Sequence, residues 1–234
     1  MKIALFGYGK MGKMVEKIAL QRGHIIIEKI DAGNAEPDIS RADVAIDFSV
    51  PSSALKNISL CLERHVPVVS GTTGWLTDYN KAVTLCKEKN GAFIHASNFS
   101  LGVNLFFQLN GYLARLMKHF PQYETGIEEI HHTQKLDAPS GTAIKLAEDI
   151  IANTSKTGWK LGEAGENEIP IAAKRTANVP GTHTVSYMGT NDTIAIQHIA
   201  HNREGFALGA IIAAEWIIGK KGVYTMKDVL NLEQ

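Results

Sequence analysis

The chain has 234 residues, of which 44% are hydrophobic, and its 24 Lys plus Arg balance its 24 Asp plus Glu. This length suits one large or two modest globular domains, and a formal charge of zero argues against a general attraction to nucleic acid or to an anionic membrane. Cys61 and Cys86 lack any disulfide or metal-ligand spacing, so both are predicted to be buried thiols. The N-terminal apolar run ends in glycines rather than in a cleavage site, and no segment approaches the roughly 18 apolar residues of a membrane helix. A cytoplasmic enzyme is therefore expected.

The N-terminal residues indicate a strand, a glycine-rich turn and a helix. Lys2 to Phe6 is a short apolar strand, residues 7–12 read GYGKMG, and the following apolar residues up to Ala19 have helical spacing. In such a turn the first glycine permits a tight bend, the second lets the backbone approach a pyrophosphate, and the third allows close packing of helix on strand. The pattern predicts a dinucleotide-binding turn at the N-terminus of a helix.

Asp31 follows the second predicted strand, His24 to Ile30, and lies 19 residues after Gly12. Dinucleotide-binding folds place an acidic residue at about this spacing to bind the ribose hydroxyls. Only about a dozen residues separate Asp31 from the third predicted strand, Val44 to Phe48, which is short for a full crossover helix. The second repeat of the fold is therefore predicted to be trimmed.

The rest of the first domain alternates between helix and strand. Helices are predicted at Ser52 to Glu63 and Asp78 to Lys89, and strands at Val66 to Ser70 and Ala92 to Ala96. Two polar loops, Gly71-Thr72-Thr73-Gly74 and Ser97-Asn98-Phe99-Ser100, follow these strands. Open α/β sheets bind their ligands at the carboxyl ends of the strands, although loops of this composition are equally often simple connections.

The pattern changes after Gly102, which predicts a second domain. An amphipathic helix is predicted at Val103 to Lys118, and strand-like runs follow at Thr125 to His131, Glu168 to Arg175, Thr182 to Gly189 and Asp192 to Ala200. Residues 189–191, Gly-Thr-Asn, are a hairpin signal, so the sheet is predicted to be mixed or antiparallel. The apolar helix Ala207 to Ile218 is expected to return to the first domain. The predicted domains are residues 1–100 with 203–234, and residues 101–202.

The segment Glu129 to Ala143, EIHHTQKLDAPSGTA, concentrates the polar chemistry of the second domain. His131 and His132 can form hydrogen bonds or take up protons near neutral pH, and Lys135 adds a charge that can hold a carboxylate or donate a proton. These side chains suit chemistry on an anion. A pair of solvated histidines on a surface loop is the structural alternative.

A Ser140-Gly141-Thr142 turn closes this segment. Glycine between two hydroxyl residues allows backbone N–H groups to face an anion, as at many helix N-termini. Ser140 or Thr142 is expected to cap the helix predicted at Ala143 to Ala152.

The order His-His-x-x-Lys-x-Asp-Ala-Pro-Ser-Gly-Thr-Ala resembles the signature of the 4-hydroxy-tetrahydrodipicolinate reductase family, the dihydrodipicolinate reductases of bacterial lysine and diaminopimelate synthesis. Motifs similar to those of the family run from Gly7 to about Leu230 in the family's order. The resemblance implies an α/β fold, with a Rossmann-like parallel sheet and a second α+β domain on a mixed or antiparallel sheet. It also implies NADH or NADPH as cofactor, a cyclic dicarboxylate substrate that loses water to give tetrahydrodipicolinate, and a homotetramer.

Site residues carry over from the resemblance position by position. His131 and Lys135 are expected to be catalytic, and either one can supply the proton. Substrate contacts are expected at His132, Ser140, Gly141 and Thr142. Cofactor contacts are expected at Gly7, Tyr8, Gly9, Lys10, Met11, Gly12, Asp31, Gly71, Thr72, Thr73, Ala96, Ser97, Asn98, Phe99, Arg203 and Phe206. No metal is expected, because the chain has no HExxH or clustered Cys/His spacing.

The chain departs from the family pattern in two places. The glycine turn is one residue shorter than the usual form, and position 32 is alanine where many members carry arginine. Asp31 can accept hydrogen bonds from both ribose hydroxyls of NADH but would repel the 2′-phosphate of NADPH. Because Ala32 offers no guanidinium, NADH is predicted to serve at least as well as NADPH, unless Lys10 or Lys29 reaches the phosphate.

Two other functions are compatible with a dinucleotide-binding fold, since a fold does not determine a substrate. One is an NAD-dependent dehydrogenase of another amino or keto acid, and the His-His-x-x-Lys block argues against it. The other is a dinucleotide-sensing protein without turnover, which the intact His131 and Lys135 argue against.

Overall fold

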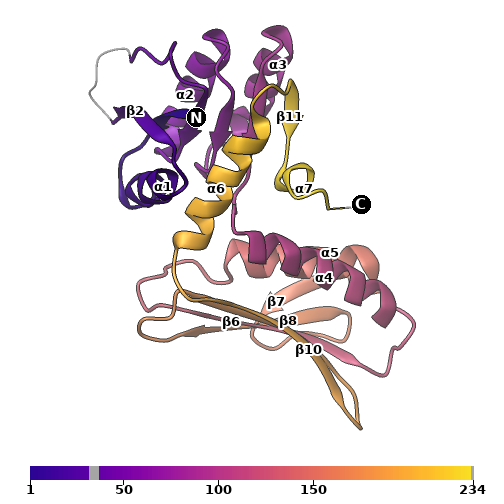
Figure 1. The fold of residues 1–234 in the computed structure, drawn as a ribbon. Coiled ribbons are helices and arrows are strands. Elements are labelled where there is room, and N and C mark those ends of the chain that lie inside the picture. The colour runs from indigo at the N-terminus through magenta and orange to yellow at the C-terminus, as the bar shows by residue number, and fades with distance from the viewer. Residues whose placement is uncertain (32–36, 233–234) are drawn as a thin grey trace. The chain divides into compact units, whose positions relative to one another are not determined.

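The structure is a computed structural model that describes residues 1–31 and 37–232. The chain divides into two compact units (Figure 1). Unit 1 comprises Met1–Leu101 and Glu204–Gln234, and unit 2 comprises Gly102–Arg203. Each unit has its own sheet and its own hydrophobic core. Within the described ranges, no helix has both the length and the apolar character needed to cross a bilayer.

The described residues of unit 1 form a six-stranded sheet of order β2-β1-β3-β4-β5-β11 in which every neighbouring pair is parallel. Its strands are β1 (Lys2–Phe6), β2 (Ile25–Ile30), β3 (Val44–Asp47), β4 (Val68–Ser70), β5 (Ala92–His95) and β11 (Gly222–Tyr224). The strand order reverses between β1 and β3, which is the position where open parallel sheets bind ligands. The predicted Rossmann-like parallel sheet is confirmed.

Helices cover both faces of this sheet (Figure 1). Helices α1 (Lys10–Gln21) and α6 (Glu204–Ile217) pack on one face, and α2 (Pro51–Glu63) and α3 (Tyr79–Glu88) pack on the other. Strand β3 is buried at all four positions, because both faces of a parallel sheet are covered in this way. Helix α6 is mostly apolar, and six of its residues are buried in the core of unit 1. Cys61 and Cys86 are buried free thiols, as predicted.

Some elements of unit 1 did not follow from the sequence pattern. Strand β11 and helix α7 (Met226–Val229) are short, and a 3-10 turn at Leu76–Asp78 precedes α3. A three-residue strand has no periodicity of its own to detect, and β11 exists through its pairing with β5. Residues 37–43, the described part of the connection between β2 and β3, contain no helix. Ala32 lies outside the described residues.

Residues 102–203 form a five-stranded mixed sheet of order β10-β9-β6-β8-β7. Its strands are β6 (Glu124–His131), β7 (Gly158–Leu161), β8 (Glu168–Arg175), β9 (Gly181–Met188) and β10 (Thr193–Ala200). Strands β6, β9 and β10 are antiparallel, whereas β6, β8 and β7 are parallel. The predicted mixed sheet is confirmed, and the predicted hairpin joins β9 to β10. The short strand β7 was not predicted.

Helices α4 (Leu101–Met117) and α5 (Gly141–Asn153) lie on one side of this second sheet (Figure 1). Their apolar residues, among them Phe106 and Leu146, form the core of unit 2 with the sheet residues Ile127 and Val185. Strand β6 alternates strictly between buried and less buried positions. Its buried face begins with Thr125 and Ile127 and ends with two ionisable residues, Glu129 and His131.

Candidate functional site

The glycine turn of unit 1 is tightly packed on one side and open on the other. Gly7 has a positive φ of 82°, and a Cβ there would lie 2.3 Å from the carbonyl oxygen of Phe48 at the end of β3. A Cβ at Gly12 would lie 2.2 Å from the carbonyl oxygen of Gly7, so helix and turn need a glycine at that contact. No atom lies within 4 Å of the Cβ position at Gly9, the N-cap of α1. The turn therefore leaves its backbone exposed at Gly9, as a pyrophosphate requires.

Asp31 belongs to the same site as the glycine turn. Its carboxylate accepts a hydrogen bond from the backbone N–H of Tyr8 at 3.1 Å. Gly7, Gly9 and Asp31 line a cavity of about 930 Å³ at the switch point between β1 and β3. A cavity of this size beside an exposed turn and an acidic residue fits the adenosine and pyrophosphate of a dinucleotide.

The cavity also has lining residues that the sequence did not single out. They are contributed by the end of β3 and by α2, and include Phe48, Ser49, Val50, Ser53, Lys56 and Asn57. The spacing of Ser53, Lys56, Asn57 and Leu60 along α2 places them on one face of that helix. Lys56 is notable as a cation that lines the same cavity as Asp31.

The loop after β4 is held by a buried aspartate. Asp47 is fully buried at the end of β3 and accepts hydrogen bonds from Asn57 Nδ2 at 3.0 Å, Ser70 Oγ at 2.8 Å and Thr72 Oγ1 at 2.7 Å. Thr72 Oγ1 in turn accepts the backbone N–H of Ser49 at 2.9 Å. Asp47 therefore ties the loop containing Thr72 to β3 and α2.

The two loops that are expected to contact the cofactor, residues 71–73 and 96–99, lie beside each other. Strands β4 and β5 are neighbours in the sheet, and the N–H of Ala96 donates to the carbonyl of Ser70 at 3.2 Å. Phe48 contacts both loops, because its ring lies against Gly71 and its centroid is 6.0 Å from that of Phe99 in an edge-to-face arrangement. Thr73 and Ser97 are exposed in these loops, and Asn98 accepts the N–H of Ser100 at 2.9 Å.

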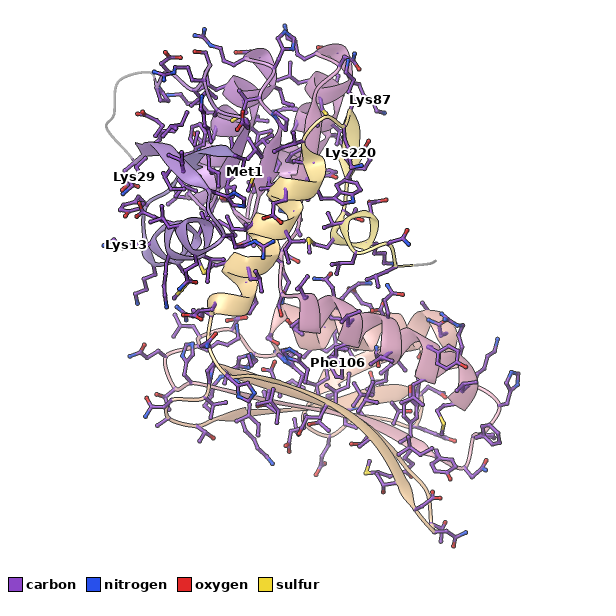
Figure 2. All side chains as sticks on the ribbon, viewed as in Figure 1. Met1, Lys13, Lys29, Lys87, Phe106 and Lys220 are labelled. Atoms are coloured by element: carbon purple, nitrogen blue, oxygen red, sulfur yellow. The ribbon has the colours of Figure 1, made fainter. Side chains whose placement is uncertain are left out.

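Lys29 is already engaged in unit 1. Its ammonium lies 2.7 Å from a carboxylate oxygen of Glu16, donates to the Tyr8 hydroxyl at 3.1 Å, and sits 4.5 Å from the centre of the Tyr8 ring. Hydrogen bonds from Lys29 and, next, from the Tyr8 hydroxyl lower the pKa of Glu16 below its usual value. Figure 2 labels Lys29 and Lys13, whose ammonium is 5.9 Å from the same ring. Lys10 is exposed in the first turn of α1, and Met11 packs against the core of unit 1.

In unit 2, sheet register brings the end of β6 together with β8 and β9. Glu129 is directly opposite His183 in the antiparallel pairing of β6 with β9, and His131 is paired with Arg175 in the parallel pairing with β8. His131 Nδ1 and His183 Nε2 each lie 3.7 Å from Glu129 Oε2, and the two imidazole rings are 5.0 Å apart. These three residues, here named the Glu129 cluster, are all buried. Only His131 was predicted as a site residue.

Ser140 connects the Glu129 cluster to helix α5. Its N–H donates to Glu129 Oε2 at 3.0 Å, and its hydroxyl forms a hydrogen bond with His183 Nε2 at 3.1 Å. The same hydroxyl accepts the N–H of Ala143 at 3.2 Å, so Ser140 is the N-cap of α5. Gly141 is exposed and Thr142 partly buried in the first turn of the helix, where backbone N–H groups are available to an anion.

Lys135 lies on the loop of residues 132–140, which joins β6 to α5. Its ammonium contacts both carboxylate oxygens of Asp137 at 2.7 Å. This pairing demonstrates that the ammonium can bind a carboxylate on this loop. His132 is partly buried at the start of the loop, and its backbone carbonyl accepts the N–H of Lys135 at 3.1 Å.

The ionisable groups of the cluster have shifted pKa values. Burial lowers the pKa of His131 to about 4, although the charge of Glu129 acts in the opposite direction. Burial would raise the pKa of Glu129, but the adjacent His183 imidazole and the hydrogen bonding with Ser140 outweigh it and hold that pKa at about 2. Near neutral pH the structure therefore holds a neutral His131 imidazole beside an ionised Glu129.

The Glu129 cluster also has a composition seen in metal sites. In Glu129, His131 and His183, one possible ligand atom from each residue lies within 4.8 Å of the other two. However, the carboxylate oxygens of Glu129 already accept N–H groups from Ser140 at 3.0 Å and from Arg175 Nη2 at 3.2 Å. A guanidinium at this distance opposes a second cation, so the contacts favour a hydrogen-bonded carboxylate. That no metal is needed remains a prediction.

Arg203 and Phe206 were also expected to contact cofactor. Arg203 is exposed and is the last residue of unit 2, and Phe206 lies in the first turn of α6 in unit 1. Their role stays a prediction.

Comparisons with known proteins agree along the whole chain. A family model described as dihydrodipicolinate reductase, N-terminus, matches residues 1–99, and one described as dihydrodipicolinate reductase, C-terminus, matches residues 102–230. The chain is 57% identical over 234 residues to the 4-hydroxy-tetrahydrodipicolinate reductase of Christiangramia forsetii, covering 99% of this chain and 98% of the relative. It is 36% identical over 261 residues to the protein of the same name in Archaeoglobus fulgidus, covering 99% and 100%.

A solved structure supports the fold. Dipicolinate-bound dihydrodipicolinate reductase from Paenisporosarcina sp. TG-14 matches with a TM-score of 0.80 at 22% identity, covering 100% of this chain and 99% of that one. The family suggested by the motif at residues 129–143 is thus confirmed by comparisons that do not depend on that motif alone. The chain belongs to the dihydrodipicolinate reductase family of NAD(P)H-dependent oxidoreductases.

Proposed function

We propose that the chain reduces 4-hydroxy-tetrahydrodipicolinate, with unit 1 binding NAD(P)H and unit 2 binding the dicarboxylate. The observation that carries this proposal is the arrangement at the start of α5. There, a Ser140-capped helix N-terminus and the Lys135 ammonium follow a neutral His131 on one short segment. Such a segment offers two kinds of carboxylate-binding group, of which the Lys135 ammonium can also donate a proton, and a neutral imidazole that can form hydrogen bonds.

The residues of unit 1 fit a dinucleotide. The exposed backbone at Gly9 and the N-terminus of α1 would hold the pyrophosphate, and Asp31 would accept the ribose hydroxyls. The loops at residues 71–73 and 96–99, held together through Phe48, would contact the nicotinamide end. When bound, the reduced cofactor supplies the hydride.

The residues of unit 2 would bind and protonate the substrate. The backbone N–H groups of Gly141 and Thr142 would hold one carboxylate of the substrate. The other carboxylate would bind the Lys135 ammonium, with His132 nearby, in the place that the Asp137 carboxylate now occupies. Because His131 is neutral at pH 7, we assign proton donation to Lys135 and orientation of the substrate by hydrogen bonding to His131. The reaction adds one hydride and one proton, and loss of water gives tetrahydrodipicolinate.

We propose that NADH serves at least as well as NADPH. Asp31 lines the cavity and its carboxylate would lie against a 2′-phosphate. Lys29, one of the cations that could offset this repulsion, is paired with Glu16. Lys56 lines the same cavity as Asp31 and is therefore a further cation that could bind the 2′-phosphate of NADPH. Comparing the activity with NADPH and with NADH tests this role.

We also propose a homotetramer in the cytoplasm, assembled through the sheet of unit 2. Helices α4 and α5 lie on one side of that sheet (Figure 1). Its edge strand β10 carries the exposed residues Ile194 and Ile199. Exposed apolar side chains on an edge strand suit pairing with a second copy. Light scattering that gives a stable monomer would contradict this assembly.

Oxidation of NADH on addition of the product of the dihydrodipicolinate synthase reaction tests the proposed function. The absorbance of NADH is followed with this substrate and, as controls, with other amino and keto acids. Consumption restricted to the synthase product supports the reductase. Consumption with another amino or keto acid identifies the alternative dehydrogenase, and binding of NADH without consumption identifies a sensing protein.

A further inference from the structure

The loop of residues 132–140 carries Lys135 and leads into the Ser140-Gly141-Thr142 turn, yet residues 136–138 are exposed to solvent. The groups that hold this loop in place are at the C-terminal ends of β6 and β8. There a fully buried carboxylate, Glu129, meets the guanidinium of Arg175 at 3.2 Å.

Each partner of this ion pair holds a different part of the loop through the backbone. Glu129 accepts the N–H of Ser140 at 3.0 Å. Arg175 donates from Nη2 to the carbonyl of Asp137 at 2.6 Å and from Nε to the carbonyl of Lys135 at 3.3 Å. The pair therefore contacts the backbone of the loop at Lys135, at Asp137 and at Ser140, the N-cap of α5.

We infer that Glu129 is a positioning residue for the reductase reaction. Together with Arg175, it fixes the distance between Lys135 and the N-terminus of α5. This distance has to match the distance between the two carboxylates of the substrate. This inference rests on the proposed function, in which Lys135 and the Gly141-Thr142 N–H groups bind the substrate. The Glu129 carboxylate is fully buried and the Arg175 side chain is 22% exposed, so water competes less for their hydrogen bonds to the loop backbone than for those of the exposed loop side chains.

The chemistry requires a carboxylate at position 129. One oxygen accepts the Ser140 N–H while the other faces Arg175, and the same group lies 3.7 Å from both histidine rings. Glutamine has nearly the same shape but a single acceptor oxygen and no charge. Glu129→Gln therefore breaks at least one of these contacts and leaves the Arg175 guanidinium without its counter-charge.

The direct readout is hydrogen exchange of the loop amides in the full-length protein, measured by NMR without substrate. In Glu129→Gln the Ser140 amide is expected to exchange roughly tenfold to hundredfold faster, the change for loss of one charge-assisted hydrogen bond. In kinetics, the KM for the dicarboxylate is expected to rise about tenfold or more and kcat to fall by a similar factor. The KM for NADH is expected to stay within about twofold, because the cofactor groups lie in unit 1.

Glu128→Gln is the matched control. Glu128 precedes Glu129 in β6, points to the other face of the sheet, and pairs with Lys174 of the same strand β8. The substitution removes a carboxylate and an ion pair between the same two strands without touching the loop. It is expected to leave loop exchange and both KM values unchanged.

A double variant separates positioning from stability. Removing both charges of a buried pair often restores stability that a single change has lost. Glu129→Gln with Arg175→Met is therefore expected to recover the free energy of unfolding relative to Glu129→Gln, while loop exchange stays fast and the KM for the dicarboxylate stays high. Recovery of KM and kcat together with stability would mean a merely structural role, and would overturn the inference.

Three further results bear on the positioning role of Glu129. Unchanged exchange at Ser140 in Glu129→Gln overturns the inference, as does faster exchange with unchanged KM and kcat. If the wild-type protein does not reduce the dicarboxylate, the proposed function fails, and dipicolinate binding by calorimetry then decides the positioning role. Weaker dipicolinate binding by Glu129→Gln than by Glu128→Gln supports it, and equal or absent binding in all three proteins overturns it.

Discussion

Asp47→Asn is expected to weaken both the stability of unit 1 and its affinity for the cofactor. Asp47 is fully buried, and its Oδ2 accepts both Ser70 Oγ and Thr72 Oγ1 while its Oδ1 accepts Asn57 Nδ2. An asparagine has one acceptor oxygen, so its amide nitrogen must face either the Asn57 amide or the two hydroxyls.

The magnitude follows from these contacts. A hydrogen bond to a charged group contributes about 1.5–3 kcal/mol, and a buried donor left without an acceptor costs roughly 1–3 kcal/mol. With at least one bond lost and the charge removed from the others, we expect the free energy of unfolding to fall by about 2–4 kcal/mol. Because Thr72 also accepts the N–H of Ser49, the cofactor loop should shift, and the KM for NADH should rise about tenfold.

Urea unfolding and steady-state kinetics measure the two effects. Asp43→Asn is the control, because it places the same substitution just before the opposite end of β3, where the exposed Asp43 accepts the N–H of Lys2 at 2.6 Å. The control is expected to change the free energy of unfolding by less than about 1 kcal/mol, as for most surface positions. An unfolding free energy and a KM for NADH in Asp47→Asn that match those of the control would refute the reasoning.

Four further predictions follow from the two units. Lys135→Ala and His131→Ala should each lower kcat by about 10²-fold or more, with a higher substrate KM in Lys135→Ala, and a near-normal kcat would remove that residue from the chemistry. Because the pKa of His131 falls from 6.5 to about 4 in the folded state, its contribution to stability is present above pH 6.5 and is lost as the pH falls towards 4. This loss amounts to roughly 3 kcal/mol, and urea unfolding at several pH values should give a shallower dependence in His131→Gln than in the wild type. The kcat/KM for NADH should at least equal that for NADPH, and Ala32→Arg should raise the kcat/KM for NADPH. A clear NADPH preference in the wild type would contradict this and would indicate that Lys56, which lines the same cavity as Asp31, binds the 2′-phosphate. Activity should survive EDTA, and a loss that zinc or magnesium reverses would contradict this.

The parts of this protein that were predictable from the sequence are those built from neighbouring residues. The β1 strand, the GYGKMG turn and α1 were readable because a glycine at a close approach and a helical repeat are local properties. Ser140 was one of two expected caps for α5, since capping depends on a side chain reaching an N–H three residues on. The fifteen-residue motif at 129–143 indicated the family for the same reason, as its chemistry is contiguous in the chain.

Tertiary structure decided what depends on pairing between distant strands. Glu129 meets His183 and Arg175 because of the register of β6 with β9 and β8, and no spacing along the chain encodes that register. Likewise, Lys56 enters the cavity of Asp31 only because the sheet places β1 beside β3, with α2 following. The neutral state of His131 is a consequence of burial, which isolated residues do not have. Residue types and their local order thus identified the chemistry, whereas strand register and desolvation determined which groups face one another and in which charge state.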